Sequence, residues 1–383
     1  MKATPSYNEM LSQLVALPSI SSDNPHIDQS NLLVVELLAE WLKSLNFEVE
    51  IMPLPGEQGK ANLIASWGKG PGGLVLSGHS DTVPYDENLW ESDPFRLTEK
   101  NNRLYGLGAT DMKGFFPLAI EAIKHFKPEQ IKEPLIFVAT ANEETSMSGA
   151  KALVDQGRPK ARYAIIGEPT GLRPIRMHKG ITMEAIRITG QSGHSSDPSL
   201  GNNAIEAMHH VLTTIMSWRE SLTNRLRNEL FVIPFTTVNL GCIHGGDNPN
   251  RICGSCELQI DIRPVPGMHL EELRSELNKL LLPIAKQHKI KIQLAALFPG
   301  IPAFETPANA HLVKVAEKLT GHCAEAVAFG TEAPFFQKLE TETIILGPGS
   351  IDQAHQPNEF IALDQISTGI SQIRHFIQQF CID

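Results

Sequence analysis

The chain has 383 residues, of which 42% are hydrophobic and 20% are charged, as in ordinary folded globular proteins. Its formal net charge of -10 argues against the basic surface by which proteins bind nucleic acid or anionic membranes. Because a single hydrophobic core stops growing at about 250 to 300 residues, we expect two domains.

The beginning of the chain, MKATPSYNEM, lacks the apolar core of a signal peptide. The most apolar stretch, LLVVELLAEWL, is interrupted by Glu36 and Glu40, so we expect neither export nor a membrane anchor. The cysteines are few and odd in number, which is typical of reduced cytosolic thiols. They are Cys242, Cys253, Cys256, Cys323 and Cys381. We therefore expect a cytoplasmic protein without a structural disulfide.

Short β-rich segments alternate with helical patterns in the first half of the chain. The leucines between Leu32 and Leu42 predict a helix that Asp28 could cap, and GFFPLAIEAIKHF predicts another, with Pro117 in its first turn. The expected strands are NLIASW (62–67), GLVLSG (73–78), LIFVATA (135–141) and YAIIG (163–167). This alternation predicts a layered α/β domain with a largely parallel sheet.

From about residue 180 the order of the expected elements changes. Strands are expected at 183–190, 236–244, 256–264 and 289–297, and helices at 202–220 and 269–288. This β-α-β-β-α-β order is the split βαβ pattern of a ferredoxin-like domain. Helices near 309–320 and 364–380 and a strand at 343–347 follow. We therefore expect a discontinuous domain of residues 1–178 and 298–383, and an inserted domain of residues 179–297.

Acids and histidines stand where apolar segments end in turns, which is where α/β enzymes place their sites. They are His79 and Asp81 in LSGHSDTVP, Asp111 in GLGATDMKG, Glu143 and Glu144 in ANEETSMSG, Glu168 in IIGEPT, and His355 in IDQAHQPNEF. Taken singly, each could be a turn former, a cap or a surface group. Together they form a donor set that suits zinc and similar ions, and two adjacent glutamates repel each other unless a cation or a shared proton compensates.

Six motifs resemble, in order and spacing, those of the dinuclear zinc amidohydrolase family, over essentially the whole chain. They are GHSDTVP, GATDMKG, ANEETSMSGA, GEPT, GQSGHSSDPSLGNNAIE and QAHQPNE. The resemblance implies a zinc-peptidase-like catalytic domain, with a mixed, largely parallel sheet flanked by helices, and an inserted ferredoxin-like α+β domain that serves as lid and dimerisation domain.

The resemblance also implies the ligands of two divalent metal ions, with Zn²⁺ as the first expectation and Co²⁺ as the alternative. His79 and Glu168 would hold one ion and Glu144 and His355 the other, while Asp111 would bridge them. Relatives often hold the peptide bond after this aspartate in the cis form, so we expect a cis Asp111–Met112 bond.

Three further residues receive catalytic roles from the resemblance. Asp81 would accept the other imidazole N–H of His79 and fix its tautomer. Glu143 would be the general base and acid. His194 would donate to the oxyanion in the active site of a partner subunit, which implies a homodimer. From the residues alone, His194 could instead cap the helix that begins near Asn202.

The resemblance assigns the substrate's α-carboxylate to Asn250, Arg263 and the Gly330–Thr331 turn. NRIC stands where many relatives have Asn-x-Ile-Pro, so the sequence departs from the family around Asn250. From the residues alone, Arg263 could instead be a surface arginine paired with Glu257 or Asp261.

The function implied by the resemblance is hydrolysis of the amide bond of a small N-acyl amino acid. RMHKG, GGDNPNRIC, DIRPVPGM, GTEAPF and LGPGSIDQAHQP are most similar to members that convert N2-acetyl-L-ornithine to L-ornithine and acetate in arginine biosynthesis. A sister amidase that acts on succinyl-diaminopimelate or on dipeptides is the alternative, and a binding protein without turnover is the third hypothesis.

The motif CGSC could be drawn as a second zinc site or as a redox dithiol. On a strand, however, Cys253 and Cys256 would point to opposite faces, and no helix begins after them to activate a thiolate. We therefore expect no site there.

Overall fold

The computed structural model describes residues 4–70 and 72–383, which form two compact units. The discontinuous unit comprises the described part of Met1–Arg176 together with Thr306–Glu325 and Thr331–Asp383. The inserted unit comprises Met177–Glu305 and Ala326–Gly330. It therefore extends further along the chain than the expected range of 179–297, because two short strands, β8 (Ile175–His178) and β13 (Phe304–Glu305), pair where the chain enters and leaves it.

The sheet of the discontinuous unit has parallel strands at its centre. Its order is β1-β2-β6-β3-β7-β15-β8-β13, and β14 (Glu325–Val327) pairs with β8. Strands β6, β3, β7 and β15 run parallel to one another, and β2 is antiparallel to both of its neighbours, β1 and β6. The strands are β1 (Glu48–Pro53), β2 (Ala61–Trp67), β3 (Leu74–His79), β6 (Leu135–Thr140), β7 (Tyr163–Ile166) and β15 (Glu342–Ile345). Every residue of β3, β6 and β7 is buried, as expected for parallel strands covered on both faces.

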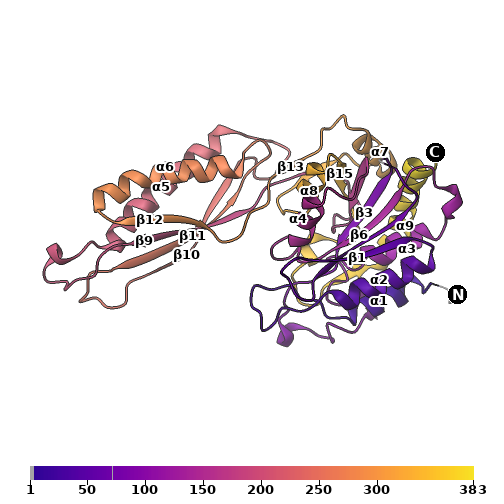
Figure 1. Cartoon of the computed structure of the whole chain (residues 1–383), viewed down its shortest axis with the longest axis horizontal. Helices are drawn as coiled ribbons and strands as arrows, with labels where there is room; N and C mark the ends of the chain where they lie inside the picture. Colours follow the sequence, from indigo (N-terminus) through magenta and orange to yellow (C-terminus); the bar gives the residue numbers. More distant parts are fainter. Residues whose placement is uncertain (1–3, 71) are drawn as a thin grey trace. The chain divides into compact units, whose positions relative to one another are not determined.

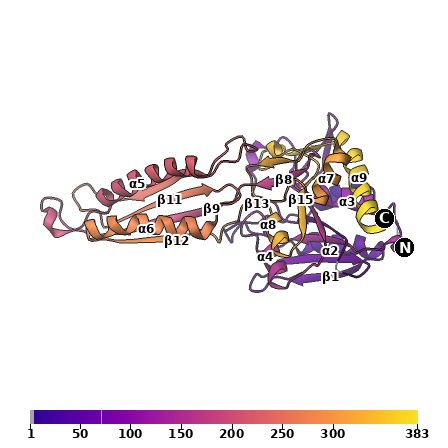
Figure 2. The same ribbon diagram turned by 90° about the horizontal axis from the view of Figure 1, so that it is seen from above.

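Helices cover both faces of this sheet. Helices α3 and α9 lie on one face, and α4 and α8 lie on the other (Figures 1 and 2). The helices of the unit are α1 (Tyr7–Val15), α2 (Leu32–Ser44), α3 (Phe115–Ile123), α4 (Ser148–Asp155), α7 (His311–Thr320), α8 (Ala333–Lys338) and α9 (Leu363–Ile377). A small separate sheet, β4 (Thr98–Lys100), β5 (Arg103–Tyr105) and β16 (Phe360–Ala362), joins two distant segments.

The expected strands and helices of this unit are confirmed to within a few residues, but the expected helix cap is wrong. Helix α2 begins at Leu32 and is preceded by Asn31. The Asp28 carboxylate instead accepts a hydrogen bond from Nζ of the buried Lys60 at 2.8 Å. Lys60 also donates to the Gln29 carbonyl at 2.7 Å, and pairing with this buried cation holds the Asp28 carboxylate away from the start of the helix.

The inserted unit is a four-stranded antiparallel sheet with two helices on one face (Figure 1). The elements follow the order β9 (Thr182–Thr189), α5 (Ala204–Arg225), β10 (Thr237–Gly245), β11 (Ser255–Arg263), α6 (Leu270–His288) and β12 (Lys291–Ala296). The strand order is β10-β11-β9-β12, which is the arrangement of the split βαβ pattern.

Alternate residues of β11 face the helices. Cys256, Leu258, Ile260 and Ile262 are buried in the core of the unit, whereas Glu257, Gln259, Asp261 and Arg263 lie on the opposite face. Cys253 also belongs to this core, and all five cysteines are free. Cys253 precedes β11, so both cysteines of CGSC pack in this one core, and the expectation that they point to opposite faces is wrong.

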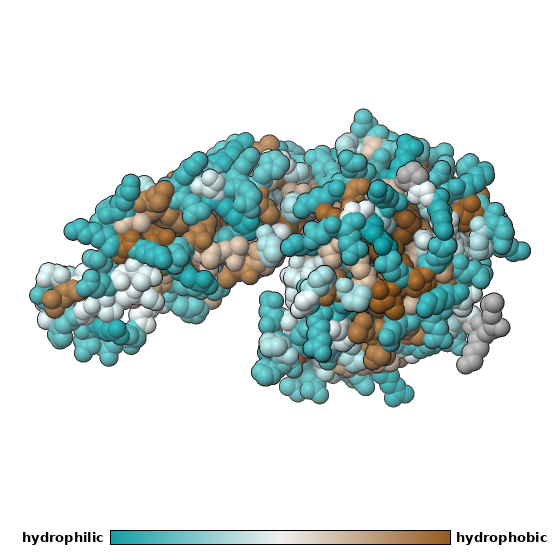
Figure 3. Space-filling view, viewed as in Figure 1, coloured by the Kyte–Doolittle hydropathy of each residue, from teal (hydrophilic) through white to brown (hydrophobic). Residues whose placement is uncertain are grey.

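Large exposed hydrophobic side chains of the described residues gather mainly on the inserted unit. Figure 3 shows hydrophobic surface on the visible face of this unit. The residues include Met183, Leu200, Ile205, Met216, Leu226, Leu230, Val232, Ile233, Ile243, Leu282 and Leu297. None of the helices in the described part of the chain combines the length and hydrophobicity that a membrane span requires.

Candidate metal centre

The carboxyl ends of the parallel strands bring the expected site residues to one edge of the sheet. His79 is the last residue of β3, Glu143 and Glu144 follow β6, and Glu168 follows β7. His355 lies in the segment after β15, with a left-handed backbone (φ 59°). Because these strands are parallel and adjacent, their carboxyl ends meet, which is where ligands bind in open α/β sheets.

Asp111 lies between the two histidines. Its Oδ1 is 3.0 Å from Nε2 of His79, and its Oδ2 is 3.4 Å from Nε2 of His355. Asp111 stands in the turn before α3, and the Asp111–Met112 peptide bond is cis, which confirms that prediction. Each carboxylate oxygen therefore faces a different histidine, as a carboxylate bridging two cations would require.

Each histidine has a second acid beside it. Oε1 of Glu168 is 3.9 Å from Nε2 of His79, and Oε2 of Glu144 is 3.1 Å from Nε2 of His355. Possible ligand atoms of His79, Asp111 and Glu144 all lie within 4.8 Å of one another. The structure thus brings the five expected ligands together as two pairs that share Asp111. Their binding of metal stays a prediction.

Asp81 is fully buried and contacts both halves of this cluster. Nδ1 of His79 lies 3.0 Å from the backbone carbonyl oxygen of Asp81 and 3.7 Å from its Oδ1. The hydrogen bond that we expected from the ring to the Asp81 side chain therefore goes to its backbone. The carboxylate instead accepts the backbone N–H of Glu143 on Oδ1 and of Glu144 on Oδ2, each at 3.2 Å.

The surroundings of the glutamates in the cluster disfavour the charged form of their side chains. Burial raises the pKa of Glu143 and Glu168 well above the ordinary value, and the neighbouring carboxylates, including Glu144, raise them further. Burial and the charge of Asp111 likewise raise the pKa of Glu144. These side chains repel one another, so positive charge would stabilise the site.

The histidines compensate for part of this negative charge. Although burial lowers the pKa of His79, its hydrogen bond to Asp111 and the charge of Glu168 raise it well above the usual range. Hydrogen bonds to Asp111 and Glu144 raise the pKa of His355 to about 10. Burial alone would raise the pKa of Asp111, but the hydrogen bonds from both histidines hold it below its usual value.

The donor set fits divalent metal ions. Buried carboxylates are stable only when they are paired or when they coordinate a metal, and here they outnumber the two imidazoles. Imidazole nitrogen and carboxylate oxygen are ligands for zinc and for cobalt alike, so the donor chemistry does not choose between these two ions.

Two buried acids near the cluster were not expected from the sequence. Glu359 is 2% exposed and accepts backbone N–H groups of the Asp111 turn, and burial raises its pKa to about 8. Glu332 is 1% exposed and accepts the Thr140 hydroxyl at 2.9 Å, and burial raises its pKa to about 7. Glu359 lies in the motif QAHQPNE and Glu332 in GTEAPF. Their hydrogen-bond partners are distant in the sequence, so no local pattern marks either contact.

His194 and Asn250 of the inserted unit lie on adjacent segments. The backbones of His194 and Arg251 form an isolated antiparallel β-bridge, and the Ser195 N–H donates to the Asn250 carbonyl at 3.1 Å. His194 is exposed, and its Nδ1 accepts the Ser196 N–H at 3.2 Å, which leaves Nε2 as the ring nitrogen that can act as a donor.

Helix α5 has its own cap, so the alternative explanation of His194 is wrong. The Asn203 side chain accepts the Ile205 N–H at 3.0 Å. His194 makes its local hydrogen bonds with Ser196 instead.

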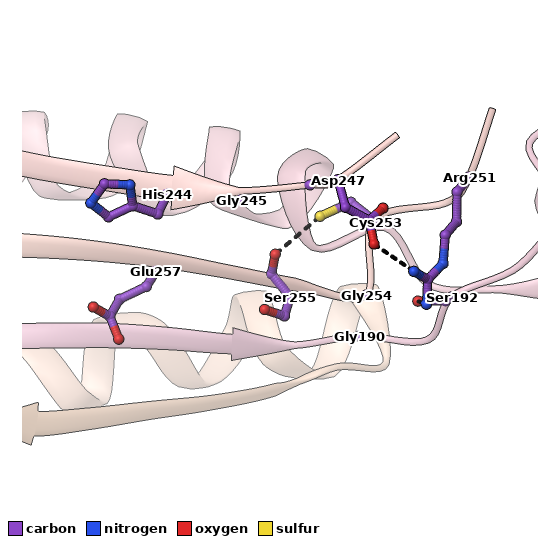
Figure 4. Close-up of a pocket in the computed structure, with 11 residues that line it drawn as sticks. Gly190, Ser192, His244, Gly245, Asp247, Arg251, Cys253, Gly254, Ser255 and Glu257 are labelled. Carbon is purple, nitrogen blue, oxygen red and sulfur yellow. Dashed lines mark hydrogen bonds and ion pairs between the residues drawn. The ribbon is translucent and has the colours of Figure 1, made fainter. Parts of the chain in front are cut away.

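A pocket of about 660 Å³ lies in the inserted unit beside these segments. Figure 4 shows His244 and Glu257 on neighbouring strands and Arg251 reaching toward Ser192. Nη2 of Arg251 donates to the Ser192 hydroxyl at 3.2 Å, and Nη1 pairs with Asp247. The Arg251 side chain therefore already has an acidic partner and a hydroxyl partner at this pocket.

Arg263 stands at the opposite end of the same sheet from His194 and Asn250. It is the last residue of β11, which has nine residues and spans about 26 Å at about 3.3 Å per residue. The segments of His194 and Asn250 continue beyond the other end of β11, at Ser255. Nε of Arg263 donates to both carboxylate oxygens of Asp261, at 3.1 and 2.9 Å, so the structure contains one of the two pairings of the surface alternative.

The Gly330–Thr331 turn stands at the boundary between the units. Gly330 is the last residue of the inserted unit, and Thr331 begins the returning segment of the discontinuous unit. Thr331 is buried, and its hydroxyl accepts the Ala333 N–H at 3.1 Å. Whether this turn contacts substrate stays a prediction.

A parallel sheet with histidines and carboxylates gathered at its carboxyl edge defines a candidate metal-dependent hydrolase. Residues 75–379 match the model of peptidase family M20/M25/M40. The chain is 49% identical over 381 residues to the acetylornithine deacetylase of Pasteurella multocida (strain Pm70), with 100% of each chain covered. It is also 49% identical to the acetylornithine deacetylase of Photorhabdus laumondii subsp. laumondii, with 99% of this chain and 98% of that one covered. The chain therefore belongs to peptidase family M20/M25/M40.

Solved structures of the family share this fold. The M20 family metallo-carboxypeptidase Sso-CP2 of Sulfolobus solfataricus aligns with a TM-score of 0.77 at 18% identity, covering 98% of this chain and 99% of that chain. A dinuclear metal-binding peptidase of the M20 family from Bacillus subtilis aligns with a TM-score of 0.69 at 15% identity, covering 98% of each chain.

Proposed function

We propose that the chain hydrolyses N2-acetyl-L-ornithine to L-ornithine and acetate, as a cytoplasmic step of arginine biosynthesis. The observation that carries this proposal is the gathering of His79, Asp111 and His355, with their acids, in a chain that is 49% identical over its full length to acetylornithine deacetylases. The free cysteines support a reducing compartment.

The proposed cofactor is a pair of divalent metal ions, Zn²⁺ in the first place and Co²⁺ as the alternative. His79 and Glu168 would hold one ion, Glu144 and His355 would hold the other, and Asp111 would bridge them. Such a pair would polarise the amide carbonyl and lower the pKa of the attacking water. The pairing of the side chains around Asp111 supports this assignment.

Glu143 is the proposed general base and acid. It would remove a proton from the attacking water and deliver it to the amine that leaves. It lies after β6 beside Glu144, at the edge of the sheet where the expected ligands gather. Asp81 supports this role because its carboxylate fixes the backbone N–H of Glu143 and of Glu144.

The proposed assembly is a homodimer formed through the inserted unit. Asn250 and Arg263 are both assigned to the substrate, yet they stand at opposite ends of a sheet whose strand β11 alone spans about 26 Å. A substrate of this size cannot contact both residues of one chain. We therefore assign Arg263 to one chain's site and His194 with Asn250 to the partner's site, as an isologous dimer permits.

Two surface features of the inserted unit support this dimer. Strand β10 is at the edge of its sheet, and an edge strand presents unpaired backbone groups to a second chain. The exposed hydrophobic side chains of the described residues also lie mainly on this unit, and apolar patches mark association surfaces.

The substrate's α-carboxylate is assigned to Asn250, Arg263 and the Gly330–Thr331 turn, with His194 donating to the oxyanion. Arg263 would exchange Asp261 for the substrate carboxylate, which presents the same paired acceptors. The exposed Nε2 of His194, whose Nδ1 is already bonded to Ser196, supports its role as a donor.

A panel of N-acyl amino acids tests the substrate assignment. Zinc-loaded protein should release acetate and L-ornithine from N2-acetyl-L-ornithine with a higher kcat/KM than for succinyl-diaminopimelate or for a dipeptide. A preference for succinyl-diaminopimelate or for the dipeptide would replace the proposal by the sister amidase. Zinc binding without turnover of any substrate would support the hypothesis of a binding protein.

A further inference from the structure

Glu359 closes the turn that carries Asp111. Its Oε1 accepts the backbone N–H of Thr110 at 2.7 Å and of Asp111 at 2.9 Å, and its Oε2 accepts the N–H of Gly108 at 2.9 Å. Its own backbone carbonyl accepts the Gly106 N–H at 3.1 Å. One residue therefore receives four backbone donors from a single turn.

The same contacts tie two ligand-bearing segments together. Strand β16, which begins directly after Glu359, pairs with β5, which ends directly before the Asp111 turn. His355 lies four residues before Glu359 and contacts Asp111. The position of Asp111 relative to His355 thus depends on how these two segments are joined.

The side-chain contacts of the buried Glu359 are specific to one turn. The hydrogen bonds that its carboxylate accepts in the described part of the chain all come from backbone amides. The neighbouring buried Lys113 donates instead to the carbonyls of Leu14 and Leu17. Removing a carboxylate from water is unfavourable unless several donors surround it, and here three amides of one turn do so.

We propose that Glu359 is a positioning residue for the metal centre, and that its carboxylate holds the Gly108–Asp111 turn so that the two oxygens of Asp111 face His79 and His355. This inference rests on the proposed two-metal function. Glu359 does not contact the reacting atoms, so it acts through Asp111. Asp81 contacts Glu143 and Glu144 in the same manner, through consecutive backbone amides.

The substitution Glu359→Gln tests this role with little change of shape. One carboxamide oxygen can still accept the Thr110 and Asp111 N–H groups. The carboxamide NH₂ would then face the Gly108 N–H, so that two donors oppose each other. The turn should lose a hydrogen bond, and Asp111 should lose its fixed orientation.

The measurement is zinc binding by metal-free protein, by equilibrium dialysis with zinc alone. We expect Glu359→Gln to weaken zinc binding by about 10- to 100-fold, the usual effect of removing a residue that orients a ligand. Excess zinc should restore much of the lost kcat, because the chemistry of Glu143 is untouched. The matched control is Glu184→Gln, which removes a buried carboxylate of the inserted unit that accepts Arg274 and Thr182. This control should lower thermal stability without changing zinc affinity.

Zinc affinity of the Glu359→Gln protein equal to that of the wild type would overturn the inference, and so would an equal loss in Glu184→Gln. If Glu359→Gln does not fold, Glu359→Asp replaces it, because a side chain shorter by one methylene keeps the charge but cannot reach all three amides. Wild-type zinc affinity in that variant would overturn the inference equally. A wild-type chain that binds no zinc would instead refute the proposed function itself.

Discussion

Oδ2 of Asp81 accepts the backbone N–H of Glu144 at 3.2 Å, and Oδ1 accepts the N–H of Glu143 at the same distance. The segment that carries both glutamates is therefore fixed by an acid that stands two residues after His79 in the sequence. The His79 ring is held separately, by the backbone carbonyl of Asp81 at 3.0 Å. One residue orients three members of the site by different atoms.

Asp81→Asn should therefore disturb the glutamates more than the histidine. A carboxamide can accept one of the two N–H groups but opposes the other with its NH₂. We expect kcat to fall by about 10- to 100-fold, with weaker zinc binding, as for other residues that orient ligands. Steady-state kinetics and zinc dialysis measure both effects, and Asp364→Asn, at an exposed position in the first turn of α9, is the control. Unchanged kinetics in Asp81→Asn would contradict this explanation.

The adjacent glutamates should differ in phenotype when each is replaced by alanine. Glu143→Ala should lower kcat by about 10²- to 10⁴-fold, because it removes the group that transfers the proton. It should keep two metal ions, because Glu143 is not a proposed ligand. Glu144→Ala should lower the metal content, because it removes a ligand. Metal analysis of both proteins after dialysis decides the point. Equal loss of metal from the two variants would show that the division of roles is wrong.

The metal-free protein should become less stable from neutral to alkaline pH because of His355. Hydrogen bonds to Asp111 and Glu144 raise its pKa from 6.5 to about 10 in the folded state. The resulting stability is fully present below pH 6.5 and is lost as the pH rises through about 10. Thermal unfolding of wild type and His355→Gln between pH 6 and about 10 measures it, and the difference should shrink with pH. A difference that is constant over this range would exclude the ion pairs as its source.

Zinc should compete with this protonation. Metal binding needs a neutral imidazole, so adding zinc at neutral pH should release protons from the wild-type protein. His355→Gln should release fewer protons per zinc bound, and calorimetry in buffers of different ionisation enthalpy measures the number. The same proton release in both proteins would remove His355 from the ligand set.

A mixture of two inactive variants should recover activity if His194 acts in the partner's site. Glu143→Ala and His194→Ala should each be nearly inactive alone. Random exchange of equal amounts should place an intact site in each mixed dimer and restore about a quarter of the wild-type sites. Differential tagging confirms that the subunits exchange. Exchange without recovery would place His194 in the site of its own chain or outside catalysis.

The sequence predicted the positions of the metal-centre residues better than their orientations. His79, Glu143 and Glu168 follow buried segments, and the carboxyl ends of parallel strands must meet, so their proximity follows from the pattern. The sequence did not predict which atom of Asp81 the His79 ring contacts, because both the carboxylate and the backbone carbonyl of Asp81 lie within reach of the ring.

Glu359 shows the limit of sequence reasoning most clearly. Its partners are backbone amides of Gly108, Thr110 and Asp111, and every residue except proline carries such a donor. No residue type or spacing therefore marks the contact. The error at Asp28 has a related cause, because Lys60 lies 32 residues further along the chain and competes for the same carboxylate.

The most direct test of the account is a zinc titration of metal-free protein, with bound zinc and deacetylation of N2-acetyl-L-ornithine followed together. We expect the wild type to bind two zinc ions per chain, activity to appear as they bind, and chelation to remove it. Asp111→Ala, which lacks the residue between His79 and His355, should not assemble the pair. Full activity in the presence of a chelator, or wild-type zinc stoichiometry in Asp111→Ala, would contradict the account.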